Sequence, residues 1–107
     1  MRRFGQVIGI VPEKLEYYKK LHANAWQGVL DMIDICNIHN YSIYVYNNKL
    51  FAYYEYTGSD YEADMKKMAE DPLTQQWWAE CMPCQAPVPE RPEGAWWMDL
   101  DEVFHCD

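Results

Sequence analysis

The alternation of apolar and polar positions predicts a strand at the start of the chain. Residues 3–11 (RFGQVIGIV) carry apolar side chains on both faces of an extended segment. They are Phe4, Ile8 and Ile10 on one face, and Val7 and Val11 on the other. This pattern is typical of a strand that is covered on both sides.

One long helix is predicted to follow over residues 12–36. Pro12 and Glu13 favour a helix start, because proline is tolerated in the first turn and an acid suits the positive end of the helix dipole. Spacings of three and four residues place one apolar stripe on a single face. The stripe is Leu15, Tyr18, His22, Trp26, Val29 and Ile33. His22 therefore points inward, an ionisable side chain among apolar ones.

The middle of the chain predicts a β-hairpin. Two β-rich runs, 38–46 and 49–57, flank Asn47 and Asn48, and asparagine tolerates the positive φ angles of a tight hairpin turn. The rest divides into a helix capped by Ser59–Asp60 and ending at Asp71–Pro72, a short helix over 73–82, a proline-rich loop over 83–94 and a last strand over 96–105.

The predicted order is strand, helix, strand, strand, helix, strand. This is the ferredoxin-like βαββαβ arrangement, an α+β fold with both helices on one face of an antiparallel sheet. Residues 1–107 are expected to form a single domain. Because the first strand is apolar on both faces, the bare sheet face needs a cover, and a second copy of the chain in a homodimer would supply it.

Composition narrows the function classes. The chain has a formal net charge of −8, which argues against nucleic-acid and membrane partners, since both demand a basic surface. It contains nine tyrosines and five tryptophans, side chains that suit binding sites as well as cores. No targeting segment is recognisable, so a cytoplasmic location is expected, with the cysteines reduced.

The segment Cys81-Met82-Pro83-Cys84 resembles a redox motif or half of a zinc site. A redox pair needs its first cysteine at a helix N-terminus, whereas this motif follows a predicted helix. Structural zinc needs four ligands, and neither Cys36 nor the pair His105 and Cys106 offers a second half-site. Small structural thiols are the favoured interpretation, and no metal is expected.

Other titratable residues are weak candidates. His39 and His105 fall in predicted strands, where structural histidines are more common than catalytic ones. Glu55 lies among aromatic residues and could be buried. The carboxylates expected to be solvated are Asp99, Asp101 and Glu102.

The aromatic residues leave two interpretations open. Trp77 and Trp78 point about 100° apart on a helix, so one ring can enter the core while the other faces a cavity. Core packing alone would explain both rings. It would equally explain Tyr18, His22 and Trp26, which predict either a filled core with one histidine or a binding site.

Several segments in the same order resemble the L-rhamnose mutarotase family. They are Tyr18-x-x-x-His22-x-x-x-Trp26, HNYSIY at 39–44, QQWW at 75–78 and EVFH at 102–105, and they span nearly the whole chain. The resemblance implies a dimeric α/β barrel of ferredoxin-like subunits. It also implies an isomerase that interconverts the α and β anomers of L-rhamnose or a related 6-deoxyhexose without a cofactor.

The resemblance also implies roles for five residues. His22 corresponds to the family's proton-donating histidine. Tyr18 and Tyr41 correspond to its sugar-contacting tyrosines, and Trp77 and Trp78 to its paired tryptophans.

The chain departs from the family pattern in two places. Gln27 stands where many members have proline. The segment CQAPVPERPEGAWW at 84–97 differs from shorter members and could reshape the rim of the site, which bears on the preferred sugar.

The implied chemistry explains the inward histidine. Anomer exchange opens the pyranose ring, with one proton leaving the anomeric hydroxyl and one reaching the ring oxygen, and histidine has a pKa suited to that task. Two alternatives remain at this stage. One is a small dimeric α/β-barrel monooxygenase or haem-degrading enzyme, and the other is a non-catalytic sugar-binding module.

Overall fold

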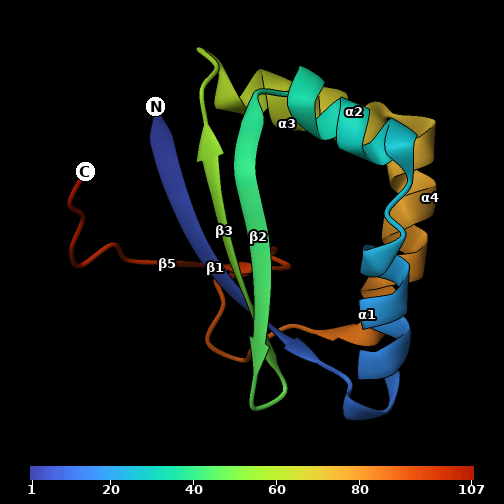
Figure 1. Ribbon diagram of the computed structural model, residues 1–107. Coiled ribbons are helices and arrows are strands. Elements are labelled where there is room, and N and C mark those ends of the chain that lie inside the picture. The colour runs from blue at the N-terminus through green and yellow to red at the C-terminus, as the bar shows by residue number, and fades with distance from the viewer.

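The computed structural model describes residues 1–107 and has two layers, a curved antiparallel sheet and helices packed against one of its faces (Figure 1). The strands are β1 (Arg2–Ile10), β2 (Ile38–Tyr46), β3 (Lys49–Tyr56), β4 (Gln85–Ala86) and β5 (Met98–Leu100). Their order is β2-β3-β1-β4, and β5 also pairs with β1. This topology confirms the predicted ferredoxin-like arrangement.

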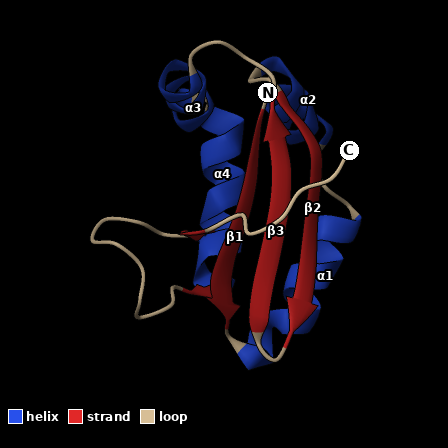
Figure 2. Ribbon diagram, turned by 90° about the vertical axis from the view of Figure 1, so that its left-hand side faces the viewer, coloured by secondary structure: helices blue, strands red, loops and turns tan.

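The helices lie on the opposite side from the C-terminal tail. They are α1 (Leu15–Ala23), α2 (Gln27–Ile35), α3 (Tyr61–Glu70) and α4 (Pro72–Cys81), with short 3₁₀ turns η1 (Pro12–Lys14) and η2 (Met82–Cys84). Figure 2 shows the strands in front and all four helices behind them. No helix is long and apolar enough to cross a membrane.

The prediction of one helix over 12–36 is wrong, because the chain breaks between α1 and α2. Asn24 closes α1, and its side-chain amide donates to the carbonyl of Lys20 at 3.3 Å. Trp26 has an extended backbone, with φ −70° and ψ 133°, and precedes α2. Asparagine competes for local backbone hydrogen bonds and so favours such ends. The break lets α2 turn away from the direction of α1 (Figure 1).

The second pair of helices bends where the sequence predicts. The Asp60 side chain accepts from the Ala63 amide at 3.1 Å and caps α3, and the Asp71 side chain accepts from the Thr74 amide at 2.9 Å and caps α4. Pro72 occupies the first turn of α4. Both helical segments therefore change direction over the sheet.

The hairpin between β2 and β3 forms as predicted, but it contains an irregularity. Asn47 and Asn48 have φ angles of 51° and 57° at the turn. The β2–β3 register shifts between His39 and Ser42, and Asn40 there has a φ of 50°. The extra residue is a β-bulge, which changes which later side chains point toward the helices.

The inner face of the sheet carries the core. Ile8 and Leu50 are almost completely buried there and pack with Tyr18, Val29 and Trp77. On the other face, Val7 is buried between its cross-strand neighbours Phe51 and Met98.

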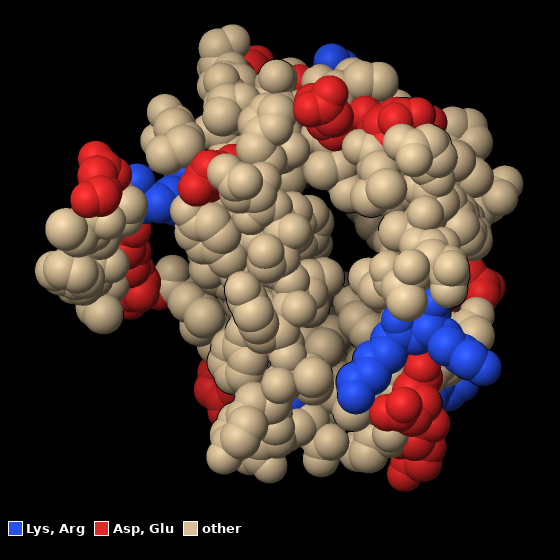
Figure 3. Space-filling model, viewed as in Figure 1, with Lys and Arg blue, Asp and Glu red and all other residues tan.

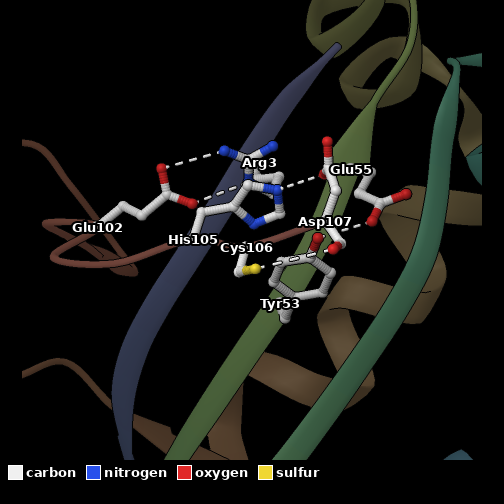
Figure 4. Close-up of polar contacts among 7 residues, drawn as sticks. All are labelled: Arg3, Tyr53, Glu55, Glu102, His105, Cys106 and Asp107. Atoms are coloured by element: carbon white, nitrogen blue, oxygen red, sulfur yellow. Dashed lines mark hydrogen bonds and ion pairs between the residues drawn. The ribbon is translucent and has the colours of Figure 1, made fainter.

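The last strand is much shorter than the predicted 96–105. After Leu100 the chain leaves the sheet and crosses its open face as a tail (Figure 2). The Arg3 guanidinium forms a two-pronged ion pair with Glu102, at 2.8 and 3.2 Å, in place of further strand pairing. Figure 4 shows this pair beside Tyr53 and Glu55 of β3.

Candidate active site

A cavity of about 410 Å³ lies between the inner face of the sheet and the helices. Small-molecule sites commonly span about 300–1,000 Å³. In Figure 3 the opening lies between the sheet side and the helix side, and its visible rim is formed mainly by uncharged residues. Fifteen of the 19 lining residues are hydrophobic. The lining includes all five residues singled out from the sequence, namely Tyr18, His22, Tyr41, Trp77 and Trp78.

His22 lies in the last turn of α1, and its two ring nitrogens have different environments. Nδ1 lies 2.9 Å from the backbone carbonyl oxygen of Tyr18. A carbonyl can only accept, so Nδ1 carries a proton and donates it in this bond. In the neutral ring Nε2 is then unprotonated, and it has no partner within the protein. Burial lowers the pKa of His22, so the neutral form predominates at neutral pH.

Aromatic rings hold the imidazole of His22 in place. The Tyr18 ring stacks on it with centroids 4.1 Å apart, and Trp77 meets it edge-on at 5.0 Å. The position of the break after α1 matters here, because Trp26 also meets Trp77 edge-on, with ring centroids 5.2 Å apart. Trp26 itself does not line the cavity, so it acts on the site only through Trp77.

Tyr18 belongs to the core and also lines the cavity. The residue is only 4 % exposed. Its hydroxyl oxygen lies 3.2 Å from the side-chain nitrogen of Gln85, which donates to it. Burial raises the pKa of Tyr18 well above its usual value, so the hydroxyl stays protonated.

Tyr41 reaches the cavity from the sheet because of the bulge at Asn40. Strict alternation from the inward-facing Ile38 would turn Tyr41 to the opposite face. Its ring instead lies tilted against that of Tyr54 at 5.4 Å. Loss of hydration raises the pKa of Tyr41 to about 12, although 42 % of the residue is exposed.

The paired tryptophans both line the cavity, at different depths. Trp77 is 7 % exposed and belongs to the core. Trp78 is only partly buried. The divergence of neighbouring side chains on a helix, about 100°, accounts for the difference.

Most of the other cavity residues were not anticipated as site residues, and Gln6, Gln85, Trp96 and Trp97 are among them. Gln6 donates to Asp99 at 2.8 Å, and Trp96 donates through its indole nitrogen to Gln85 at 2.7 Å. The pair Trp96-Trp97 was the available sequence signal for this part of the site, because it repeats the Trp-Trp pair at 77–78. Its place beside the cavity could not be predicted, because it lies far from the other site residues in the sequence.

The remaining candidates lie outside the cavity or form no centre of their own. Cys81 and Cys84 are buried free thiols, and only Cys81 lines the cavity. Glu55 is half-buried on the open face, where it accepts hydrogen bonds from Tyr53 and Asn40. No group of three or more His, Cys, Asp or Glu residues is placed to hold a metal ion.

The two strand-histidine candidates pair with carboxylates at the surface. His39 lies 3.8 Å from Asp34. His105 lies in the tail rather than in a strand and contacts Asp107 at 2.7 Å (Figure 4). Asp99, Asp101 and Glu102 are all exposed, as expected, and Glu102 also pairs with Arg3.

Comparison with known proteins gives a consistent match. The family model for L-rhamnose mutarotase matches residues 3–106. The L-rhamnose mutarotase of Oceanobacillus iheyensis is 33 % identical and that of Bacillus subtilis 29 % identical, each over 100 % of both chains. That of Lactiplantibacillus plantarum is 32 % identical, again over 100 % of both chains.

Solved structures share the fold over the whole length. The L-rhamnose mutarotase of Formosa agariphila superposes with a TM-score of 0.77 at 19 % identity, covering 100 % of each chain. Tetracenomycin F2 cyclase of Streptomyces glaucescens superposes with a TM-score of 0.71 at 11 % identity, with the same coverage. The fold thus occurs with different chemistries, and the sequence matches decide between them. The chain belongs to the L-rhamnose mutarotase family.

Proposed function

We propose that this protein interconverts the α and β anomers of L-rhamnose or a closely related 6-deoxyhexose, with His22 as the group that moves the proton. The observation that carries the proposal is the placement of His22 on the cavity wall. Its Nδ1 is committed to the Tyr18 carbonyl at 2.9 Å, which leaves Nε2 available to a ligand. Burial lowers the pKa of His22, so the imidazole is neutral at neutral pH and can act as a general base in this position.

Ring opening begins when Nε2 of His22 takes the proton of the anomeric hydroxyl. The electron pair of that O–H bond forms the C=O bond, and the bond from the anomeric carbon to the ring oxygen breaks with its pair going to the ring oxygen. The two oxygens share one carbon, so the imidazolium can return its proton to the ring oxygen. Rotation of the aldehyde and reversal of these steps gives the other anomer.

The aromatic residues bind and orient the sugar in this proposal. Tyr18, one turn before His22, donates a hydrogen bond to a sugar oxygen. Tyr41 contacts a hydroxyl from the sheet side. Trp77 and Trp78 offer ring faces and edges to the apolar side of the sugar, including the methyl group of a 6-deoxyhexose.

The composition of the cavity supports a deoxysugar as the ligand. Its wall is largely apolar, with Val29, Ile33, Ile43 and Met68 among the lining residues. A methyl group is accommodated in such surroundings without cost, whereas the 6-hydroxyl of an ordinary hexose would need a hydrogen-bonding partner there.

The mutarotase hypothesis is favoured over both alternatives. Relatives that match along their full length are named L-rhamnose mutarotases. These names favour a mutarotase over a monooxygenase or a haem-degrading enzyme. Ring opening requires an acid, a base and a binding surface, so the proposed mechanism uses no cofactor.

A cytoplasmic location belongs to the same proposal, because all four cysteines are free thiols, the form maintained by a reducing compartment.

We also propose that two copies assemble through the open face of the sheet. Tyr44, Tyr46, Phe51 and Leu100 are exposed there, although each is large and apolar. The tail adds Val103 and Phe104, which are 95 % and 80 % exposed. A second copy would bury these side chains, and contiguous patches of this kind commonly mark interfaces.

Saturation-transfer NMR tests the proposed activity directly. The signal of one anomer is saturated, and the loss of intensity at the other reports their exchange. The protein should accelerate the exchange between the anomers of L-rhamnose. The same concentration of protein should accelerate the anomer exchange of D-glucose less. Binding without acceleration would support the non-catalytic sugar-binding module instead.

A further inference from the structure

Gln85 links two aromatic side chains at the cavity. Its side-chain oxygen accepts from the indole nitrogen of Trp96 at 2.7 Å, and its side-chain nitrogen donates to the hydroxyl of Tyr18 at 3.2 Å. All three residues line the cavity. They come from α1, β4 and the loop before β5, so the contacts join distant parts of the chain.

The direction of these two hydrogen bonds is fixed by chemistry. An indole N–H can only donate, so the atom of Gln85 facing Trp96 must be the amide oxygen. The amide nitrogen then has to face Tyr18 and can only donate to it. The Tyr18 oxygen is therefore an acceptor in this bond, and its own hydrogen is free to point into the cavity.

We infer that Gln85, oriented by Trp96, is a positioning residue that makes the Tyr18 hydroxyl a hydrogen-bond donor to the sugar. The inference rests on the proposed function, which it deepens. The imidazole of His22 stacks on the Tyr18 ring with centroids 4.1 Å apart, and its Nε2 is an acceptor because Nδ1 donates to the Tyr18 carbonyl. The cavity thus presents one hydrogen-bond donor and one acceptor on stacked rings. Anomer exchange needs both, because of two oxygens on the same carbon one loses a proton and the other receives one.

The fold holds Gln85 firmly enough for this role. Gln85 pairs with Ile10 in the short β1–β4 ladder, and the Val11 amide donates to the Cys84 carbonyl at 2.8 Å. A Cβ atom at Gly9 would collide with the carbonyl oxygen of Ala86. Glycine at position 9 therefore permits the close approach of β4 that brings Gln85 to Tyr18.

Two substitutions of Gln85 separate orientation from packing. In Gln85→Glu the carboxylate accepts from both Trp96 and Tyr18, so it draws the tyrosine hydrogen away from the sugar. In Gln85→Leu both bonds are lost, but that hydrogen stays free. We expect Gln85→Glu to lower the exchange rate by about tenfold, the effect of losing one hydrogen bond, and Gln85→Leu to lower it less. Gln76→Glu, on the exposed side of α4, adds the same charge as a control and should match the wild type.

The pH dependence supplies a second test of orientation. Once protonated, the carboxyl group introduced by Gln85→Glu can donate to Tyr18 and accept from Trp96, as glutamine does. The ratio of the Gln85→Glu rate to the wild-type rate should therefore rise as the pH falls from about 8 to about 5.5, toward the usual carboxyl range. Dividing by the wild-type rate removes the titration of His22 from the comparison.

A double-mutant cycle asks whether Gln85 acts through Tyr18. In a Tyr18→Phe background the hydroxyl is absent, so Gln85→Glu should cause little further loss of exchange. Full additivity of the two losses would overturn the inference. So would a Gln85→Glu variant as fast as the wild type, or one faster than Gln85→Leu.

Amide NMR of the free protein tests the contacts without reference to catalysis. The indole N–H signal of Trp96, assigned by its disappearance in Trp96→Phe, should move in Gln85→Leu as its hydrogen bond is lost. An unmoved signal would overturn the inference even if the protein exchanged no sugar. A wild-type protein without exchange activity would instead refute the proposed function, so the two failures are distinguishable.

Discussion

Tyrosine occurs on both faces of the sheet but has a different environment on each. On the inner face, Tyr18 is buried against the core and Tyr54 shares a hydrogen bond of 2.6 Å with Tyr61. On the open face, Tyr44 and Tyr46 are 68 % and 77 % exposed. Composition alone would not separate these sets, because both are tyrosines in or against the same sheet.

Strand register, rather than residue type, decides which face a side chain serves. The bulge at Asn40 is the clearest case, since one extra residue puts Tyr41 on the cavity side while Tyr44 pairs with Phe51 on the open face. The inner face therefore carries the proposed chemistry, and the open face the proposed contact with a second copy. Substitutions in matched pairs across the sheet test that division.

The largest expected effect is the loss of activity in His22→Asn. Asparagine keeps some hydrogen bonding but cannot titrate between pH 5 and 8, so the base is lost. We expect anomer exchange to fall by roughly 10²-fold or more, the usual contribution of a positioned general acid–base group. Saturation-transfer NMR measures the rate, and circular dichroism checks the fold.

His39→Asn is the matched control for His22→Asn. His39 pairs with Glu55 on the open face and lies near Asp34, away from the cavity. It should exchange anomers at the wild-type rate. If the His39 variant lost activity and a folded His22 variant retained it, the proposed division between the two faces would be wrong.

The wild-type rate should also depend on pH through His22. Burial lowers the pKa of this imidazole below its ordinary value of 6.5, so the base is neutral and active above that range. As the pH falls through the lowered pKa, the ring is protonated and kcat/KM should decrease by up to about tenfold per pH unit. A proton-detected titration of His22 gives the same midpoint if it is the responsible group.

The sequence predicted those features that depend on local pattern. The order of elements along the chain, the hairpin turn at Asn47–Asn48 and the helix break at Asp71–Pro72 follow from residues close together in the chain. His22 was singled out because an ionisable side chain interrupts an apolar stripe. Its stacking on Tyr18, one turn away, is also a local consequence of helix spacing.

One local feature and several tertiary ones were missed. The break at Asn24 was overlooked, because the apolar stripe continues through it at helical spacing. Gln85 lies in a segment whose position depends on a two-residue ladder beside Gly9, and no periodicity marks so short a strand. The tail after Leu100 has a strand-like pattern, yet its Arg3–Glu102 pair holds it across the sheet.

Removal of one hydroxyl on each face should give a smaller difference. Tyr41→Phe removes a proposed sugar contact, so KM should rise about fivefold, in line with the loss of one neutral hydrogen bond of about 1 kcal/mol. Tyr44→Phe removes a hydroxyl from the open face and should leave KM unchanged. Equal values for the two variants would place Tyr41 outside the binding site.

A charge on the open face should change assembly more than chemistry. Phe51→Glu puts an acid at the centre of the row formed by Tyr44, Phe51 and Val7. In a dimer the two acids would face a buried surface, and burial of an unpaired charge is costly. Sedimentation should show a loss of dimer, with exchange by the folded monomer still detectable.

Gln76→Glu on α4 controls for the added charge in the sedimentation experiment. It should sediment as the wild type does. A wild-type protein that is monomeric at micromolar concentration would contradict the proposed assembly, and the exposed apolar residues would then need another cover.

The smallest effect on exchange is expected for the Cys81→Ser, Cys84→Ser double variant. Burial raises the pKa of the Cys81 thiol to about 12 and also raises that of Cys84, so both remain neutral thiols, whereas a redox pair needs a stabilised thiolate. The side chains pack in the core, where they are 4 % and 1 % exposed, and hydroxyl groups there would be poorly accommodated. We therefore expect the melting temperature to fall by several degrees, about 4–8 °C for each kcal/mol in a small domain, while the exchange rate of the folded protein stays within about threefold of the wild type, less than the loss of one hydrogen bond. A folded variant with unchanged melting temperature and lost exchange would show that the cysteines take part in the chemistry of the inner face.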